Sequence, residues 1–294
     1  MSTRTSTRLS VPHTFAPDCP IAGVLERLEP DKPTQGRKIA LILHGTLRHK
    51  DYLYQRGLAQ RLPLDSFRFD FRGNHETPGT WNTGALAEDV EDLQVVADYL
   101  IKEFGYVIDL LVGHSRGSII GYRWVCTAEE AKTVRGFVNC SGRYRMHKML
   151  ERFNTTYKEQ FEARGFYEWN VRVAGKPVTG IIRPKDVEAF ATWDNSLVWD
   201  RFPAHVHALT IHGIADTTVP PYDATIWARA LGSRSPGTHN LHYVDEADHN
   251  FTGKRDEVTN AICDWWASAE RGELTTGILY TGVRAGLESF PSKL

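Results

Sequence analysis

Residues 107–117, which read VIDLLVGHSRG, decide the fold of this 294-residue chain. Val107 to Val112 is an apolar run that predicts a buried strand, and residues 115–126 predict the helix after it. Between them, residues 113–117 match the G-x-S-x-G pattern, a sharp turn from a strand into a helix whose glycines avoid clashes. Such a turn lifts a serine hydroxyl above the sheet edge, so Ser115 is a candidate nucleophile. The simpler alternative is that Ser115 only caps the helix.

Strand and helix patterns alternate along the rest of the chain, which predicts parallel strands joined by helical crossovers. We expect an α/β fold with a mostly parallel eight-stranded sheet, helices on both faces and an antiparallel first hairpin. The expected strands are residues 9–15, 21–28, 38–43, 67–71, 107–112, 134–139, 208–211 and 240–244. The expected helices are residues 51–62, 85–104, 115–126, 219–231 and 257–269.

The alternation breaks over residues 143–203, a stretch rich in aromatic residues. An insertion between two sheet strands lies near the carboxyl ends of the strands, where open α/β sheets bind ligands. We therefore expect residues 143–203 to form an inserted cap, with residues 1–142 and 204–294 as the two parts of the core. Trp193 and Trp199, near the end of the insertion, are predicted to contact the substrate.

A serine hydroxyl needs a base to attack an acyl carbon, and the base needs an acidic residue to orient it. In folds with this turn, the acid and then the histidine follow the serine along the chain. Asp216 follows the expected strand 208–211, and His249 follows the last expected strand. Both come at carboxyl ends of strands, so we expect them to converge on Ser115, with His249 as the base and Asp216 as the orienting acid. Asp248 is the alternative acid.

Several short motifs lie around these residues, and in them the chain resembles a known superfamily. They are His44-Gly45-Thr46, Phe69-Asp70-Phe71-Arg72-Gly73, Gly113-His114-Ser115-Arg116-Gly117, the Asp216 loop and Ala247-Asp248-His249-Asn250-Phe251. In these motifs the chain resembles the α/β-hydrolase superfamily, in particular its capped branch of serine aminopeptidases, monoacylglycerol lipases and cinnamoyl esterases.

This resemblance implies roles for three further residues. The backbone N–H groups of Thr46 and Arg116 are expected to form the oxyanion hole. Because relatives carry varied residues at the position of Arg116, its side chain is expected to be dispensable for activity. His44 is expected to brace the oxyanion loop by hydrogen bonding.

The expected reaction is hydrolysis of a carboxylic ester with an apolar or aryl acyl group, through an acyl-enzyme on Ser115. An acyl-CoA thioesterase or an aminopeptidase would use the same three residues, and a non-catalytic ligand-binding protein is the third possibility. No cofactor or metal is expected, because His205 and His207 have no third ligand nearby in the sequence.

The composition argues against a nucleic-acid partner and a membrane span, and a small acyl substrate is the partner expected from the proposed reaction. Lys+Arg 35 nearly balances Asp+Glu 36 without a basic stripe, so nucleic acid is not an expected partner. No apolar run approaches the ~18 residues that a membrane span needs. The four cysteines lack CxxC spacing and are expected to be free thiols.

The last three residues match an address signal. Ser292-Lys293-Leu294 is the tripeptide that the peroxisomal import receptor reads at a C-terminus. We therefore expect this receptor as a partner and a peroxisomal location, and a cytoplasmic location otherwise.

Overall fold

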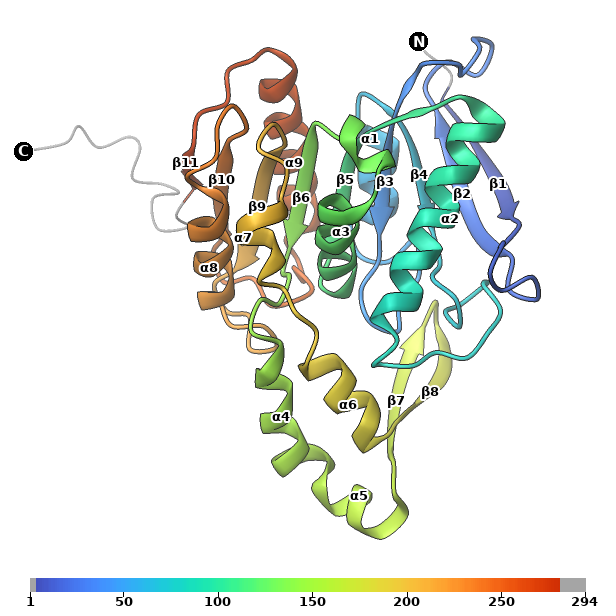
Figure 1. Ribbon diagram of the computed structural model, residues 1–294, viewed down its shortest axis with the longest axis vertical. Coiled ribbons are helices and arrows are strands. Elements are labelled where there is room, and N and C mark those ends of the chain that lie inside the picture. Colours follow the sequence, from blue (N-terminus) through green and yellow to red (C-terminus); the bar gives the residue numbers. More distant parts are fainter. Residues whose placement is uncertain (1–3, 281–294) are drawn as a thin grey trace, which may run out of the picture.

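A large sheet forms the centre of the molecule (Figure 1). Its strands are β1 (Thr5–Val11), β2 (Ile21–Arg27), β3 (Lys38–Leu43), β4 (Asp65–Phe69), β5 (Val107–His114), β6 (Gly136–Cys140), β9 (His207–Gly213), β10 (His239–Val244) and β11 (Gly277–Tyr280). The computed structural model describes residues 4–280, and over this range the nine strands lie in the order β1-β2-β4-β3-β5-β6-β9-β10-β11.

The direction of the strands follows the expectation. The pairs β1–β2 and β2–β4 are antiparallel, and the other neighbours are parallel. The mostly parallel sheet with an antiparallel first hairpin is thus confirmed. The sheet has one strand more than the eight expected, because the short strand β11 adds to the edge of β10.

Helices cover both faces of the sheet. They are α1 (Gln55–Arg61), α2 (Leu86–Phe104), α3 (Arg116–Thr127), α8 (Tyr222–Leu231) and α9 (Arg255–Glu270). Successive side chains of a strand point to opposite faces, and a central parallel strand is therefore apolar throughout. In β3, Ile39 and Leu41 pack in one apolar cluster with residues of α2, α3 and α8, whereas Ala40 and Ile42 pack in a second cluster with residues of α1 and α9.

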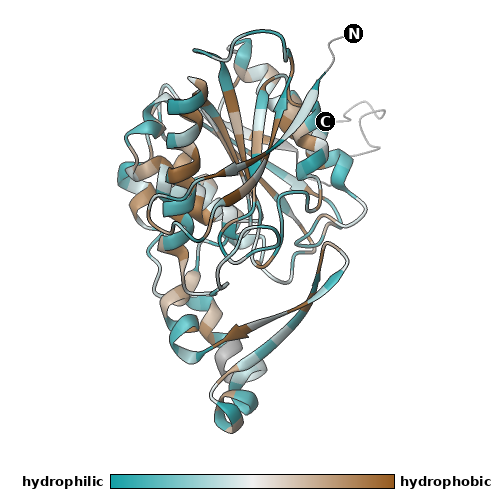
Figure 2. Cartoon of the chain, turned by 90° about the vertical axis from the view of Figure 1, so that its right-hand side faces the viewer, coloured by the Kyte–Doolittle hydropathy of each residue, from teal (hydrophilic) through white to brown (hydrophobic). Residues whose placement is uncertain are grey.

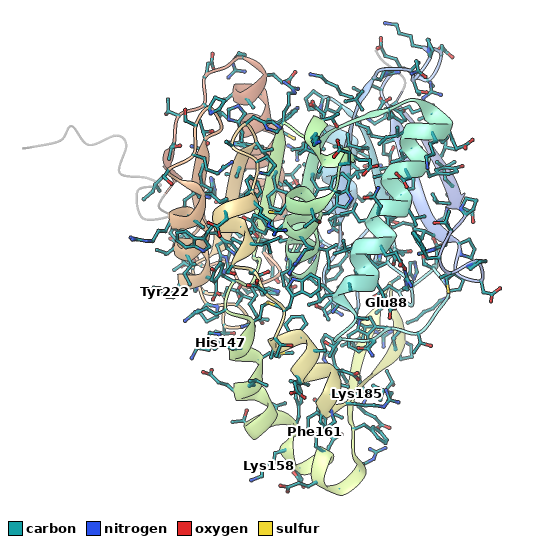
Figure 3. The ribbon with its side chains drawn as sticks, in the orientation of Figure 1. Glu88, His147, Lys158, Phe161, Lys185 and Tyr222 are labelled. Carbon is teal, nitrogen blue, oxygen red and sulfur yellow. The ribbon has the colours of Figure 1, made fainter. Side chains whose placement is uncertain are left out.

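The predicted cap segment, residues 143–203, connects β6 to β9, and its residues 149–191 extend away from the sheet (Figures 1 and 2). It contains α4 (Met149–Arg152), a π-helical turn (Phe153–Tyr157), α5 (Lys158–Arg164), the antiparallel hairpin β7 (Tyr167–Val173) and β8 (Lys176–Ile182), α6 (Pro184–Ala191) and α7 (Leu197–Arg201). The cap segment has a small apolar cluster of its own, formed by Tyr157, Ile182 and Val187. Figure 3 marks Phe161, which packs on Tyr157 with ring centroids 5.6 Å apart.

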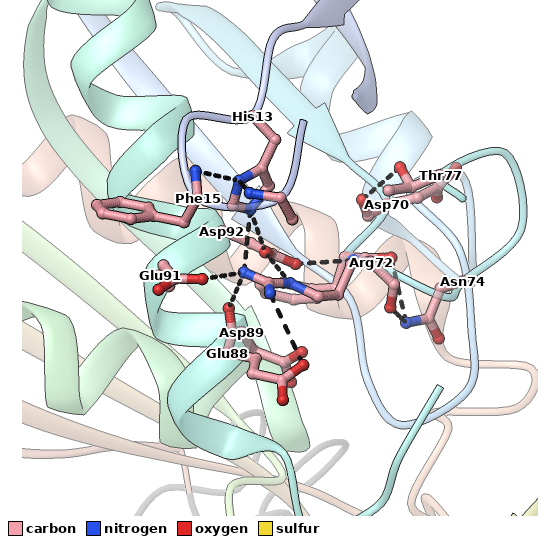
Figure 4. A network of polar contacts seen from close by, with 12 residues as sticks. His13, Phe15, Asp70, Arg72, Asn74, Thr77, Glu88, Asp89, Glu91 and Asp92 are labelled. Atoms are coloured by element: carbon pink, nitrogen blue, oxygen red, sulfur yellow. Dashed lines mark hydrogen bonds and ion pairs between the residues drawn. The ribbon is translucent and has the colours of Figure 1, made fainter. Parts of the chain in front are cut away.

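A buried polar network fixes the loop after β4 against α2 (Figure 4). Arg72 donates from Nε to Asp92 Oδ1 over 2.6 Å and from its backbone N–H to Asp92 Oδ2 over 2.7 Å. His13 Nε2 lies 2.9 Å from Asp92 Oδ1, and Glu91 also accepts from the Arg72 guanidinium. Asn74 donates to the carbonyl of Arg72 over 3.0 Å. This loop is therefore held rigidly where it approaches the end of β3.

Two expectations concern the whole chain. Within the described range, none of the helices combines the length and the apolar character that crossing a membrane requires. Ser292, Lys293 and Leu294, the predicted peroxisomal signal, lie outside the described residues.

Candidate active site

Ser115 occupies the strand-to-helix turn that the sequence predicts, at the end of β5 and directly before α3. Its backbone has φ 53° and ψ −113°, a conformation that costs a non-glycine residue of order 1–3 kcal/mol. The flanking glycines allow close packing around it. A Cβ on Gly113 would lie 2.5 Å from the Ser118 nitrogen, and one on Gly117 would lie 2.6 Å from the Leu43 carbonyl oxygen. The turn therefore requires both glycines and presents Ser115 away from the sheet.

Three side chains from three separate loops meet at this turn. Ser115 Oγ lies 2.9 Å from His249 Nε2, and His249 Nδ1 lies 2.7 Å from Asp216 Oδ2. Asp216 follows β9, and His249 follows β10. Because a carboxylate only accepts hydrogen bonds, Nδ1 carries the imidazole proton and Nε2 is left to accept from the serine hydroxyl. The structure thus brings together the three residues predicted to be catalytic.

Asp216 is held in place by several donors. Its Oδ1 accepts from the backbone N–H groups of Thr218 and Val219, each over 2.8 Å. His212 Nε2 lies 3.3 Å from its Oδ2. Burial alone would raise the pKa of Asp216, but the hydrogen bonds from His212 and His249 outweigh it and hold this pKa well below its ordinary value. The carboxylate therefore stays ionised beside His249.

The alternative acid, Asp248, accepts hydrogen bonds from its own loop. Its Oδ1 accepts from the backbone N–H of Thr252 over 2.9 Å, and its Oδ2 accepts from the Thr252 hydroxyl over 2.8 Å. These bonds close the loop after β10 upon itself. The carboxylate that accepts from His249 Nδ1 is that of Asp216, as the order of the residues along the chain predicts.

His44 braces the loop that follows β3. Its Nδ1 donates to the Gly45 carbonyl oxygen over 2.8 Å, and its Nε2 accepts from the Phe71 backbone N–H over 3.1 Å. Burial lowers the pKa of His44 to about 4, so the ring is neutral. A neutral imidazole can donate from one nitrogen and accept at the other, as these two bonds require. The rigid loop after β4 thus supports the loop that carries Thr46.

His114, which directly precedes Ser115, supports the loop that carries His249. Its Nε2 donates to the backbone carbonyl of His249 over 2.9 Å. Burial and, to a smaller extent, the nearby His249 together lower the pKa of His114 to about 3. His114 is therefore a neutral positioning residue rather than a second base.

The two predicted oxyanion-hole residues border the same cavity as the nucleophile. Thr46 and Arg116 both line the cavity into which Ser115 opens. Gly45 packs against the turn so closely that a Cβ there would lie 3.4 Å from the Ser115 Cβ. The loop after β3 and the start of α3 therefore both border the cavity next to the Ser115 side chain.

The side chain of Arg116 has a part in the fold that its sequence position does not reveal. Its buried guanidinium forms an ion pair with Asp89 of α2 and donates to the Thr83 carbonyl oxygen over 2.5 Å. Burial raises the pKa of Asp89 to about 6, although Arg116 acts against this shift. The expectation that this side chain is dispensable for activity stays a prediction, and the structure adds a role in the fold, because Asp89 pairs with it.

Replacing Arg116 by glutamine should destabilise the protein by about 3–5 kcal/mol, because a buried carboxylate would lose its counter-charge. Urea unfolding at neutral pH measures the loss. The double variant Arg116→Gln, Asp89→Asn removes both charges and should recover part of it. Equal unfolding free energies for the wild type and the single variant would show that Asp89 does not need the guanidinium.

The cavity above Ser115 has a volume of about 330 Å³ and lies between the core and the cap. Core loops supply its catalytic side, and the cap supplies its opposite wall. Tyr167 and Trp169 of β7 are two residues apart, so both point from the same face of the hairpin toward the cavity. The sequence shows this alternation, but it does not show which face of the hairpin meets the core. The aromatic lining residues are Tyr52, Tyr157, Tyr167, Trp169 and Phe190.

The predicted substrate contacts Trp193 and Trp199 are not among the described residues that line this cavity. Trp193 stacks under the guanidinium of Arg123, 4.3 Å from its ring centroid. Trp199 is 44% exposed and donates from Nε1 to the Tyr144 hydroxyl over 2.7 Å. Trp199 lies away from the cavity because α7, the helix that carries it, packs against α3 and α8. The chain therefore returns to the sheet along its helical flank rather than above Ser115.

One group of side chains in the described range has the spacing of metal ligands. Ligand atoms of Asp70, His75 and Glu76 lie within 4.8 Å of one another. However, the buried ammonium of Lys50 lies 2.6 Å from Asp70 Oδ2 and also pairs with Glu76. This ammonium thus pairs with both carboxylates, and Arg8 pairs with Glu76 as well, over 2.9 Å. The group therefore fits ion pairs that close the loop after β4 better than a metal site.

Similar proteins share this architecture. A model of the alpha/beta hydrolase family matches residues 40–261. The uncharacterized protein YDL057W of Saccharomyces cerevisiae is 30% identical over 237 residues, which cover 74% of this chain and 69% of that protein.

Solved structures with low sequence identity have the same fold. Est1E of Butyrivibrio proteoclasticus, solved with ferulic acid bound, has a TM-score of 0.68 at 15% identity, covering 88% of this chain and 98% of Est1E. The esterase Pf2001 of Pyrococcus furiosus has a TM-score of 0.64 at 14% identity, covering 90% and 91%. XC6422 of Xanthomonas campestris, described as a serine hydrolase without a lid, has a TM-score of 0.58 at 17% identity, covering 92% and 97%.

Proposed function

The chain belongs to the alpha/beta hydrolase family, and we propose that it is a serine hydrolase that cleaves a carboxylic ester through an acyl-enzyme on Ser115. One observation carries this proposal. The hydrogen bonds from Ser115 to His249 and from His249 to Asp216 form an unbroken chain that ends at a cavity of substrate size. A serine that only capped a helix would need neither partner.

In the first step, His249 Nε2 takes the proton of the Ser115 hydroxyl as Oγ attacks the ester carbonyl. Asp216 stabilises the imidazolium that forms, because its carboxylate stays ionised 2.7 Å from Nδ1. The imidazolium then gives its proton to the leaving alcohol, and the acyl group remains on Ser115. Water repeats the sequence and releases the acid.

The negative charge that develops on the carbonyl oxygen needs donors. We assign this role to the backbone N–H groups of Thr46 and Arg116, two residues that line the cavity together with Ser115. A fixed donor of this kind contributes about 3–4 kcal/mol to lowering the barrier. His44 and the ion pair of Arg116 with Asp89 hold the two donor segments in place.

The lining of the cavity favours an apolar or aryl acyl group. Its cap side is largely aromatic and apolar, with Met149, Tyr157 and Phe190 among the residues that line it. An acyl-CoA thioesterase or an aminopeptidase would use the same triad, so substrate tests must separate the three reactions. The fold by itself does not decide among them.

A substrate panel tests the proposed reaction directly. We expect the purified protein to hydrolyse 4-nitrophenyl esters with short apolar or aryl acyl groups at least roughly 100-fold faster than amino-acid 4-nitroanilides, with kcat/KM as the measure. Acyl-CoA thioesters belong in the same panel. Turnover of the anilides alone would instead establish a peptidase. Tight ester binding without any turnover would establish a ligand-binding protein.

We also propose, from the sequence, that Ser292, Lys293 and Leu294 direct the protein to the peroxisome. Imaging a fusion tagged at the N-terminus, with and without residues 292–294, tests this. A diffuse cytosolic signal from the complete fusion would argue against it.

A further inference from the structure

The cavity above Ser115 carries charge of one sign. Its described lining residues include Arg48, Arg116 and Arg143 but no aspartate or glutamate. The charge of Arg116 is balanced by Asp89. Arg143 is buried and donates to the Thr218 carbonyl oxygen over 2.5 Å. Arg48 is therefore the arginine to consider as a contact for a substrate.

Arg48 is held between aromatic rings rather than by an acid. Its guanidinium carbon lies 5.0 Å from the ring centroid of Tyr52 and 6.0 Å from that of Trp169. Its Nη1 donates to the Leu47 carbonyl oxygen over 3.1 Å. Among residues 4–280, no ion pair links Arg48 to a carboxylate within 4.0 Å. Stacking leaves the N–H edge of a guanidinium open, and this edge matches a carboxylate or phosphate in a bidentate way.

The sheet order places positive charge on both sides of the nucleophile. Strands β3 and β6 are the two neighbours of β5, which ends at Ser115. Arg48 lies in the loop after β3, and Arg143 lies after β6. A cleft lined by charge of one sign attracts ligands of the opposite sign and raises their local concentration.

We propose that the substrate carries a carboxylate or phosphate group and that Arg48 binds it. This inference rests on the serine hydrolase function proposed above, and it narrows the substrate to an anionic ester or thioester. The anionic group lies beside Tyr52 and Trp169, where the loop after β3 meets the cap hairpin. The aromatic wall of the cap contacts the apolar part of the same molecule. Arg48 is thus a specificity-determining residue and not part of the proton-transfer chain.

A purely structural role predicts a different result. Arg48 follows the core strand β3 and stacks on Trp169 of the cap hairpin, so its loss could loosen the cap. Such loosening would affect neutral and anionic substrates alike. The ratio of their kcat/KM values isolates the charge of Arg48 from its packing.

Two pairs of substrates of similar length provide this ratio. The first pair is 4-nitrophenyl hydrogen glutarate and 4-nitrophenyl pentanoate, which differ in a carboxylate on the acyl side. The second pair is butanoyl-4′-phosphopantetheine and butanoyl-pantetheine, which differ in one phosphate on the leaving group. We expect the wild type to prefer the anionic member of at least one pair by roughly 10- to 100-fold, as for a hydrogen bond to a charged group. The pair that shows the preference identifies the source of the anion.

Arg48→Gln should bring that preference close to one, and Arg48→Glu should reverse it. Arg123→Gln is the matched control, because Arg123 is also half-buried and stacked on a tryptophan, Trp193, but lies outside the cavity. It should leave the preference unchanged. In 1 M NaCl, where the screening length is about 3 Å, the wild-type preference should fall.

A ratio near one for both pairs in the wild type, or a preference that survives Arg48→Gln, would overturn the inference. A different result would contradict the proposed function itself, namely that the protein turns over no ester or thioester at all. In that case calorimetric binding of glutarate to the wild type and to Arg48→Gln still tests the anion site. Binding that weakens at least roughly tenfold in the variant supports it, and equal binding overturns it.

Discussion

Replacing Ser115 by alanine should abolish labelling by a fluorophosphonate probe and lower kcat for ester hydrolysis by roughly 10⁴- to 10⁶-fold. Only a serine whose proton can pass to a base reacts readily with such a probe, and Ser115 Oγ lies 2.9 Å from His249 Nε2. Labelling is measured by gel fluorescence, and the modified peptide is identified by mass spectrometry.

The alanine variant should keep its fold. Serine and alanine both carry a Cβ, so the strained backbone at φ 53° costs the same with either residue. The variant loses one hydrogen bond, worth about 1 kcal/mol, and thermal unfolding checks this. Undiminished labelling of the variant, at another serine, would show that Ser115 is not the nucleophile.

Asp216→Asn should lower kcat by about 10⁴-fold while leaving substrate binding largely intact. An asparagine amide has no charge to stabilise the imidazolium, and it can hold His249 in the tautomer that carries its proton on Nε2. In that tautomer the ring cannot accept from the Ser115 hydroxyl. Steady-state kinetics on an activated ester measure the effect, and circular dichroism checks the fold.

Asp248→Asn is the matched control for this experiment. Asp248 is a neighbour of His249 in the sequence, but its carboxylate accepts from Thr252 at the surface of the loop. We expect a change in kcat of less than about tenfold. If Asp248→Asn gave the larger loss, Asp248 would be the orienting acid during turnover.

The positions of Ser115, Asp216 and His249 can be predicted because each lies in a short loop directly after a strand. In a parallel sheet the strand order brings such loops to one edge, so local patterns are enough to place them together. The same holds for the loop of Thr46 after β3. The burial of β3 on both of its faces is also visible in the sequence, as a short run of apolar residues.

The cap is harder to predict, because its segments have no sheet to set their direction. Trp193 and Trp169 are both tryptophans of the insertion, but only Trp169 lines the cavity. The difference depends on how the hairpin and α7 dock, which involves contacts distant in the sequence. The partner of Arg116 is hidden for the same reason, since Asp89 lies 27 residues away on α2. Strand β11 has only four residues, too few for a clear pattern.

The cap is one continuous insertion with its own apolar cluster, and this separation matters for how such proteins diverge. The residues that would perform the chemistry stand on loops of the sheet, whereas Tyr157, Tyr167 and Trp169 belong to a single stretch of the chain. Mutations in that stretch can change which molecules fit without disturbing the contact between Ser115 and His249. Descendants of one ancestral gene can therefore acquire new selectivities while inheriting an unaltered reaction.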